Sequence, residues 1–105
     1  MGLILMKKGT CKNISVKQAQ QLFNTKNVIV VDVRDKDEYA KQSIKNSINI
    51  PVVDIKRDIK KRVKNRRTKI IVYCSSGERS IAACQILADR GYRNVYNIAT
   101  GINFQ

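Results

Sequence analysis

Two short runs of β-branched residues constrain the fold of this 105-residue chain more than any other feature. Residues 28–33 read VIVVDV and residues 69–73 read KIIVY, and neither run alternates regularly between apolar and polar side chains. A strand without a polar face is typical of a parallel sheet that is covered on both sides. Parallel neighbours need a crossover connection, which is usually a helix. We therefore expect an α/β fold with helices on both faces of the sheet.

Helix signals occur between the strand-like segments. Ser15 and Gln18 form a capping box, and apolar residues then recur at helical spacing. Gly91 stands where the C-cap glycine of a helix is expected. The alternation of the expected helices with the expected strands predicts a doubly wound, mostly parallel sheet with right-handed crossovers. The expected elements are a helix over 16–24, a strand over 28–33, a short helix that ends near 41, a strand over 48–51, a helix over 54–64, a strand over 69–73, a helix over 79–90 and a strand over 94–98.

The chain length suits one small domain. We expect residues 10–105 to form this domain and residues 1–9 to be a flexible N-terminal tail. The apolar stretch at residues 3–6 is too short for a membrane-spanning helix or for the core of a signal peptide. We therefore expect a cytoplasmic protein that has no membrane partner.

Histidine is absent, and cysteine occurs three times, at Cys11, Cys74 and Cys84. Without histidine, Ser-His and Cys-His catalysis and histidine-zinc sites are excluded. An odd number of widely spaced cysteines argues against a disulfide framework and against a metal site, and no cofactor is expected. We expect Cys84 to be a core residue of its helix and Cys11 to be a surface or edge residue. The alternative role for either is that of a resolving thiol.

Cys74 begins a polar segment, CSSGERS, that joins an expected strand to an expected helix. In a parallel α/β sheet the site lies beyond the carboxyl ends of the strands, which is where Cys74 stands. A thiol there meets the unpaired amides at the start of the helix, and Gly77 lets consecutive N–H groups turn inward. Arg79 adds a positive charge, and each of these effects lowers the pKa of a thiol. The alternative is a buried structural cysteine that is followed by an ordinary loop.

Three further motifs accompany this segment: VDVR at residues 31–34, EY at 38–39 and NIP at 49–51. Together with the pattern C-x-x-G-x-R-S they resemble the rhodanese (sulfurtransferase) family. The resemblance covers nearly the whole chain. It implies a single rhodanese-like domain whose cysteine, Cys74 here, accepts a sulfane sulfur and carries it as a persulfide.

The resemblance also implies roles for the residues around the cysteine. Asp32 and Arg34 match the family's D-x-R pair and Glu38 matches the acidic residue after it, so we expect a supporting ion-pair layer beneath the site. Arg79 matches a loop arginine that can bind an anionic donor. Glu78 is expected to point away from the sulfur, since its charge would otherwise repel such a donor. The loop residues expected to hold the persulfide are Ser75, Ser76, Gly77, Glu78, Arg79 and Ser80.

The resemblance implies an enzyme, a sulfurtransferase of the thiosulfate:cyanide type. Its thiolate would attack the outer sulfur of a small anionic donor such as thiosulfate and pass that sulfur to cyanide or to a thiol of a small molecule or protein. A non-catalytic sulfur carrier or partner-binding module is the first alternative. A phosphatase or arsenate reductase is the second, and the loop disfavours it, because the related phosphatases use a loop that is one residue longer.

The chain carries a net charge of +13, and residues 56–69 supply most of it, since nine of these fourteen positions are Lys or Arg. Ile55, Ile59 and Val63 are spaced four apart, which predicts a helix with an apolar stripe facing inward and its charges facing solvent. The simplest interpretation is a solvated helix face. The alternative is a docking surface for an acidic acceptor protein or for tRNA, although the segment has no aromatic residue to stack on bases.

Overall fold

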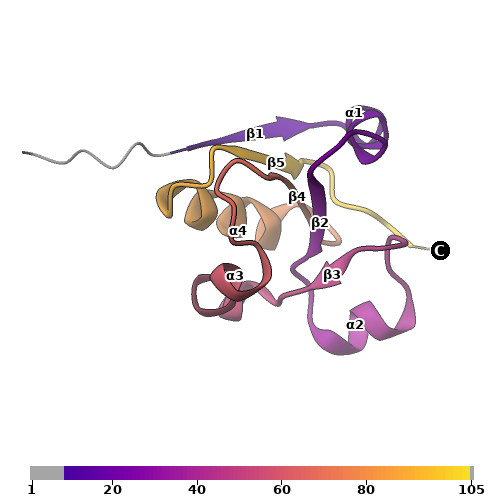
Figure 1. Cartoon of the computed structure of the whole chain (residues 1–105). Coiled ribbons are helices and arrows are strands. Elements are labelled where there is room, and N and C mark those ends of the chain that lie inside the picture. Colours follow the sequence, from indigo (N-terminus) through magenta and orange to yellow (C-terminus); the bar gives the residue numbers. More distant parts are fainter. Residues whose placement is uncertain (1–8, 105) are drawn as a thin grey trace, which may run out of the picture.

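A five-stranded parallel sheet forms the centre of the structure (Figure 1). The structure is a computed structural model that describes residues 9–104. The elements in chain order are β1 (Thr10–Ile14), α1 (Val16–Phe23), β2 (Val28–Asp32), α2 (Lys36–Lys41), β3 (Ile48–Asn49), the 3-10 helix η1 (Val52–Asp54), α3 (Ile55–Arg62), β4 (Lys69–Tyr73), α4 (Glu78–Asp89) and β5 (Asn94–Ile98). The strand order across the sheet is β1-β5-β4-β2-β3, and every neighbouring pair is parallel. The predicted helices and strands all occur, with ends that differ by two residues or fewer.

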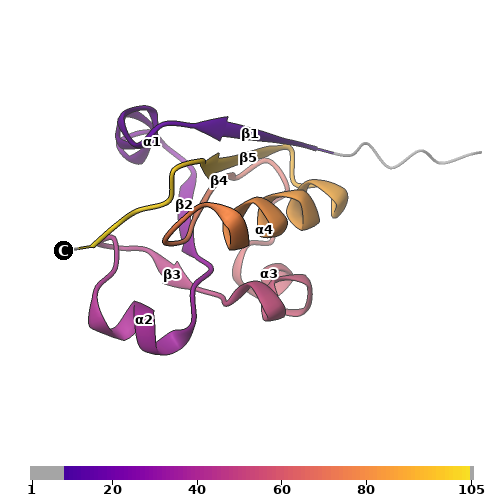
Figure 2. The same cartoon turned by 180° about the vertical axis from the view of Figure 1, so that it is seen from behind.

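Helices cover both faces of the sheet (Figures 1 and 2). α3 and α4 pack on one face, where Ile70 and Val72 of β4 join the buried cluster that holds Cys74. α1 packs on the other face, against a cluster that contains Ile71 and Tyr73 of the same strand. Both faces of β4 are thus buried, which is why its sequence shows no alternation of apolar and polar residues. This arrangement confirms the doubly wound fold.

Local sequence signals set the boundaries of several elements. The capping box of α1 is formed, because the Gln18 N–H donates to Ser15 Oγ at 3.1 Å and the Ser15 N–H donates to Gln18 Oε1 at 2.9 Å. Gly91 follows α4 with a φ of 89°, in the left-handed region expected of a C-cap glycine. Interactions between residues that are close in the sequence therefore set the start of α1 and the end of α4.

β1 is an element that the sequence pattern does not indicate. It lies at the edge of the sheet beside β5, and its largely exposed residues form no apolar run. Cys11 in β1 forms a disulfide with Cys84 in α4, so the expectation of no disulfide is wrong. Cys11 does lie on an edge strand and Cys84 is buried in the core, as expected. The register explains this pairing, because Cys11 lies opposite Val95 and packs with it on the α4 side of the sheet. The two cysteines are 73 positions apart, so the sequence hides their proximity.

The N-terminal boundary of the domain is only partly described. Residues 1–8 of the predicted tail lie outside the described residues, so their flexibility stays a prediction. At the first described residue, the Gly9 N–H donates to the Ala88 carbonyl at 3.0 Å. Within residues 9–104, no helix has both the length and the hydropathy that a membrane span requires.

The disulfide is expected to stabilise the fold, because it closes a long loop and so restricts the unfolded chain. We expect Cys11→Ala to lower the free energy of unfolding of the oxidised protein by about 2–4 kcal/mol. Urea unfolding followed by circular dichroism measures the difference. With dithiothreitol present, the free energy of unfolding of the wild type should fall to that of the variant. Equal stability of the two proteins without reductant would contradict a structural role for the bond.

Candidate functional site

Cys74 directly follows β4, which lies between β5 and β2 near the centre of the sheet. The Ile102 N–H donates to its carbonyl at 2.8 Å, so the chain after β5 lies against it. Cys74 itself is 0% exposed and packs in the cluster beneath α4. Sites in α/β sheets form at the carboxyl ends of central parallel strands, and the structure places Cys74 at such a position.

Backbone N–H groups converge on the Cys74 sulfur. The Gly77 N–H donates to Sγ at 3.1 Å and the Ser80 N–H donates to it at 3.3 Å. Burial of the sulfur raises the pKa of Cys74, but hydrogen bonds from the Ser80 hydroxyl and from the loop amides outweigh this effect and lower the pKa. The loop therefore favours the thiolate even though the sulfur has no contact with solvent.

Ser80 gives the sulfur a hydrogen-bond partner in either protonation state. In the thiol form the Cys74 Sγ–H donates to Ser80 Oγ at 3.3 Å, and the Ser80 hydroxyl donates to the Gly77 carbonyl at 3.2 Å. A thiolate can only accept, so in that state the same hydroxyl donates to the sulfur. A hydroxyl that serves both states lets the sulfur change charge without leaving a buried group unpaired.

Two glycines allow the loop to lie directly against the turn that follows β5. A Cβ atom at Gly77 would stand 2.2 Å from the Ala99 carbonyl oxygen, and Gly77 has a φ of 92°. A Cβ atom at Gly101 would stand 2.4 Å from the Ser75 carbonyl group. No other residue fits these positions without moving the backbone. The glycines thus fix the curvature that directs the loop amides at the sulfur.

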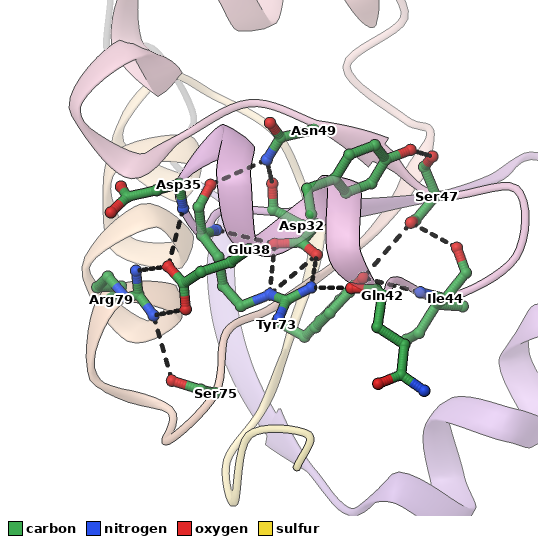
Figure 3. Close-up of polar contacts among 12 residues, drawn as sticks. Asp32, Asp35, Glu38, Gln42, Ile44, Ser47, Asn49, Tyr73, Ser75 and Arg79 are labelled. Carbon is green, nitrogen blue, oxygen red and sulfur yellow. Dashed lines mark hydrogen bonds and ion pairs between the residues drawn. The ribbon is translucent and has the colours of Figure 1, made fainter. Parts of the chain in front are cut away.

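Arg79 is paired with Glu38 of α2 (Figure 3). Its two terminal nitrogens donate to the Glu38 carboxylate at 2.7 and 3.1 Å, and Nη2 also donates to Ser75 Oγ at 3.2 Å. The hydrogen bond from Arg79 is the main cause that lowers the pKa of Glu38 to about 2. The contribution of this pair to folding is fully present above the ordinary glutamate pKa and is lost as the pH falls toward 2. Arg79 therefore ties the loop to α2.

Asp32 and Arg34 form a second, buried ion pair. Nε and Nη2 of Arg34 donate to both carboxylate oxygens of Asp32, at 2.7 to 3.1 Å, and Nη2 also donates to the Gln42 carbonyl at 2.5 Å. The guanidinium carbon lies 4.7 Å from the centre of the Phe104 ring. The three residues expected in one supporting layer thus lie in two separate pairs, Asp32 with Arg34 and Glu38 with Arg79.

A buried tyrosine near the site was not among the predicted residues. The Ile44 N–H donates to the Tyr73 hydroxyl at 3.0 Å, and Ser47 Oγ lies 3.4 Å from the same oxygen (Figure 3). Burial raises the pKa of Tyr73 to about 12, so the hydroxyl is neutral at physiological pH. Its position at the end of an apolar strand gives no sign of this network, which joins segments that are 29 positions apart.

The remaining loop side chains lie at the surface. Ser75, Ser76 and Glu78 are exposed, whereas Gly77 and Ser80 are buried. The loop therefore acts on the sulfur through its main chain and through Ser80. Within the part of the chain that the structure describes, no group of three or more His, Cys, Asp or Glu residues is placed to hold a metal ion.

Removing the Ser80 hydroxyl is expected to raise the pKa of Cys74. Ser80→Ala deletes a hydrogen bond to the thiolate and leaves the burial of the sulfur unchanged. The rate of alkylation by iodoacetamide, measured from pH 4 to about 10, should rise at higher pH in this variant than in the wild type. Ser76→Ala is the matched control, because it removes an exposed hydroxyl from the same loop. Identical profiles for Ser80→Ala and the wild type would refute this role for the hydroxyl.

Comparison with known proteins places this site in a family. Residues 15–103 match the rhodanese-like domain. The thiosulfate sulfurtransferase GlpE of Coxiella burnetii is 29% identical over 90 residues, which cover 86% of this chain and 82% of that protein. A sulfurtransferase of Allochromatium vinosum is 34% identical over 84 residues, covering 80% of this chain and 77% of that protein. The crystal structure of a rhodanese-related protein from Thermoplasma volcanium has a TM-score of 0.74 at 33% identity, covering 88% of this chain and 87% of that one.

The matched region contains the whole site. It begins at Ser15, the N-cap of α1, and includes Cys74, its loop and both ion pairs. The solved relative extends the agreement from sequence to fold. On these grounds the chain belongs to the rhodanese-like domain family.

Proposed function

We propose that this rhodanese-type sulfurtransferase moves a sulfane sulfur from an anionic donor such as thiosulfate to a thiophilic acceptor, with Cys74 as nucleophile and sulfur carrier. The observation that carries the proposal is the set of N–H groups within 3.1 to 3.3 Å of the Cys74 sulfur. They stabilise negative charge on sulfur, which is present on the thiolate before transfer and on the persulfide afterwards. The name of the Coxiella burnetii relative supports thiosulfate as a donor.

The reaction divides into two displacement steps. In the first, the Cys74 thiolate attacks the outer sulfur of thiosulfate, the S–S bond of the donor breaks, and sulfite leaves with the electron pair. In the second, an acceptor attacks the outer sulfur of the persulfide, and Cys74 leaves as a thiolate. Cyanide gives thiocyanate, and a thiol gives a new persulfide. Neither step needs a histidine base, because the loop lowers the pKa of the Cys74 thiol and so eases its ionisation.

Access to the sulfur requires a movement of the loop, since Cys74 is 0% exposed. Arg79 donates one hydrogen bond to a neutral acceptor, Ser75 Oγ at 3.2 Å, and makes a bidentate contact with the charged Glu38 carboxylate. Charge-assisted bidentate contacts are the stronger kind. We infer that an anionic donor displaces the Ser75 contact first and that Glu38 keeps Arg79 in place while the loop opens.

A sulfur carrier that serves one docked partner is the second candidate function. The buried sulfur favours it, because a freely diffusing acceptor meets no exposed Cys74 surface. Such a protein would take up the sulfur from the donor but would release it only to that partner. A phosphatase remains disfavoured by the short loop.

The cellular location predicted from the sequence stays a proposal. The Cys11–Cys84 disulfide is of a kind that persists in oxidising compartments and is rare in the cytosol. In a cytoplasmic protein we therefore expect a dithiol in the cell and a disulfide after purification in air.

The exposed cations of α3 and of the residues after it form a basic face, made up of Lys56, Arg57, Lys60, Lys61, Arg62, Lys64 and Arg67. Ile55, Ile59 and Val63 are buried on the opposite side of the segment, as their spacing predicted. Val53, just before α3, is 86% exposed. We propose that this basic face docks an acidic acceptor protein, because an exposed apolar residue beside it suits a protein partner better than a nucleic acid.

The decisive test of the proposed function is the variant Cys74→Ser. We expect its rate of thiocyanate formation from thiosulfate and cyanide to fall by about a thousandfold or more, because a serine hydroxyl is not ionised at neutral pH. Mass spectrometry after incubation with thiosulfate should show one added sulfur atom on the wild type and none on the variant. Cys11→Ser is the matched control and should keep both properties.

The outcomes of this experiment separate the candidate functions. A sulfur adduct without turnover would select the carrier. Turnover that survives in Cys74→Ser, or hydrolysis of a phosphate ester with no uptake of sulfur, would contradict the proposal. Loss of turnover in both variants would point to misfolding, which circular dichroism distinguishes.

The basic face is tested by reversing two of its charges. Lys60→Glu combined with Lys61→Glu should weaken binding of a fluorescent glutamate-rich peptide about tenfold, and added salt should weaken binding to the wild type. Lys17→Glu combined with Lys26→Glu changes the net charge equally at exposed positions elsewhere and should have a smaller effect. Equal losses in the two double variants would contradict a defined docking face. Tighter binding of bulk tRNA, lost in the same variant, would redirect the proposal to nucleic acid.

A further inference from the structure

The C-terminal segment, residues 99–104, lies across the carboxyl end of the sheet. It follows β5 and runs toward the loop between α2 and β3 (Figures 1 and 2). The Ile102 N–H donates to the Cys74 carbonyl at 2.8 Å. The backbone of Gly101 lies so close to Ser75 that a Cβ atom on the glycine would stand 2.4 Å from the Ser75 carbonyl group. The C-terminal segment therefore supports the loop around Cys74 directly.

The loop around Cys74 is bordered by α4 on one side and by the C-terminal segment on the other. Cys74 packs with α4 on one face of the sheet, whereas Ile102 and Phe104 pack in the cluster on the α1 face. Five buried residues and the Cys11–Cys84 disulfide hold α4 in place. Residues 99–104 belong to no helix or strand. The loop has to open because the Cys74 sulfur is 0% exposed, and opening displaces the C-terminal segment more readily than α4.

Phe104 anchors the C-terminal segment to the buried ion pair. The guanidinium carbon of Arg34 lies 4.7 Å from the centre of the Phe104 ring. The Tyr73 ring meets the Phe104 ring edge to face, with 6.2 Å between their centres. Both kinds of contact are favourable, and Arg34 is itself held by Asp32 at 2.7 Å. The segment that supports the loop is thus tied to a firmly held part of the site.

We propose that Phe104 is a positioning residue that controls access to Cys74. Its contact with Arg34 holds the C-terminal segment against the loop and so keeps the sulfur covered. Release of this contact lets the segment move and the loop open toward the donor. The proposal rests on the proposed function, because it states how the donor of that reaction reaches the sulfur. Phe104 acts through the backbone of the C-terminal segment and takes no part in the chemistry.

Access to the sulfur is measured by alkylation of the oxidised protein with iodoacetamide. Of the three cysteines, Cys74 is the free one, so the reaction reports on this residue. The alkylation rate rises with pH to a plateau; its midpoint reports the pKa of the thiol, and the height of the plateau reports access to the thiolate. We expect Phe104→Ala to raise the plateau about tenfold and to leave the midpoint unchanged.

Phe23→Ala is the matched control for this experiment. Phe23 is the other phenylalanine of the chain and packs in the same cluster as Phe104, but from α1. Its removal should leave the plateau at the level of the wild type. Phe104→Tyr keeps the ring and should also behave as the wild type. If circular dichroism shows that Phe104→Ala is unfolded, Phe104→Leu gives the same comparison, because it keeps apolar bulk but has no ring.

Two results of the alkylation experiment would overturn the proposal. The first is a plateau that Phe104→Ala leaves unchanged, or that Phe23→Ala raises equally, because the latter is the effect of a general loss of stability. The second is a higher midpoint with an unchanged plateau, because Phe104 would then support the shape of the closed loop and not control its opening.

The consequence for turnover is tested with thiosulfate as donor and cyanide as acceptor. If only the open form binds the donor, the apparent affinity for the donor scales with the fraction of open molecules. We therefore expect the KM for thiosulfate to fall about tenfold in Phe104→Ala while kcat stays unchanged. A raised alkylation plateau with an unchanged KM would overturn the positioning role. If the wild type takes up no sulfur from thiosulfate, the proposed function fails, while alkylation still decides whether Phe104 controls access.

Discussion

The hydrogen bonds from main-chain N–H groups to the Cys74 sulfur are the contacts on which the rest of the site depends. A sulfur with 0% exposure would by itself remain a neutral thiol, because burial disfavours charge. The bonds from Gly77 and Ser80 reverse this preference, and they require the tight curvature that the loop adopts against the turn after β5. The strand position, the glycines and the helix start together lower the pKa of a buried thiol.

Two ion pairs support the loop from different depths. The Asp32–Arg34 pair is almost fully buried. It joins the end of β2 to the Gln42 carbonyl and to the Phe104 ring, so it holds these segments together. Glu38–Arg79 is about one-third exposed and joins α2 to the loop itself. A buried pair is hard to break, since either partner left alone is an unpaired charge, whereas a partly exposed pair yields more easily. The segments joined by Asp32–Arg34 are thus held more rigidly than the loop around Cys74.

The parts that the sequence predicts are those set by local chemistry. β4 is recognisable because both of its faces are buried, α1 because Ser15 and Gln18 cap it, and the cysteine loop because it joins a buried strand to a helix start. The parts it does not predict depend on contacts distant in the sequence. β1 has no apolar run because it is an edge strand, and nothing near Cys11 points to Cys84. Which carboxylate pairs with which arginine is likewise decided by packing, so one expected ion-pair layer became two pairs.

Because the sulfur is held by backbone groups, the chemistry of this loop is separable from its choice of partner. Ser75, Ser76 and Glu78 contribute exposed side chains and are replaceable without altering the amides that surround Cys74. Substitutions at these positions can therefore change the exposed surface of the loop while the amides around the sulfur, on which the proposed reaction depends, are retained.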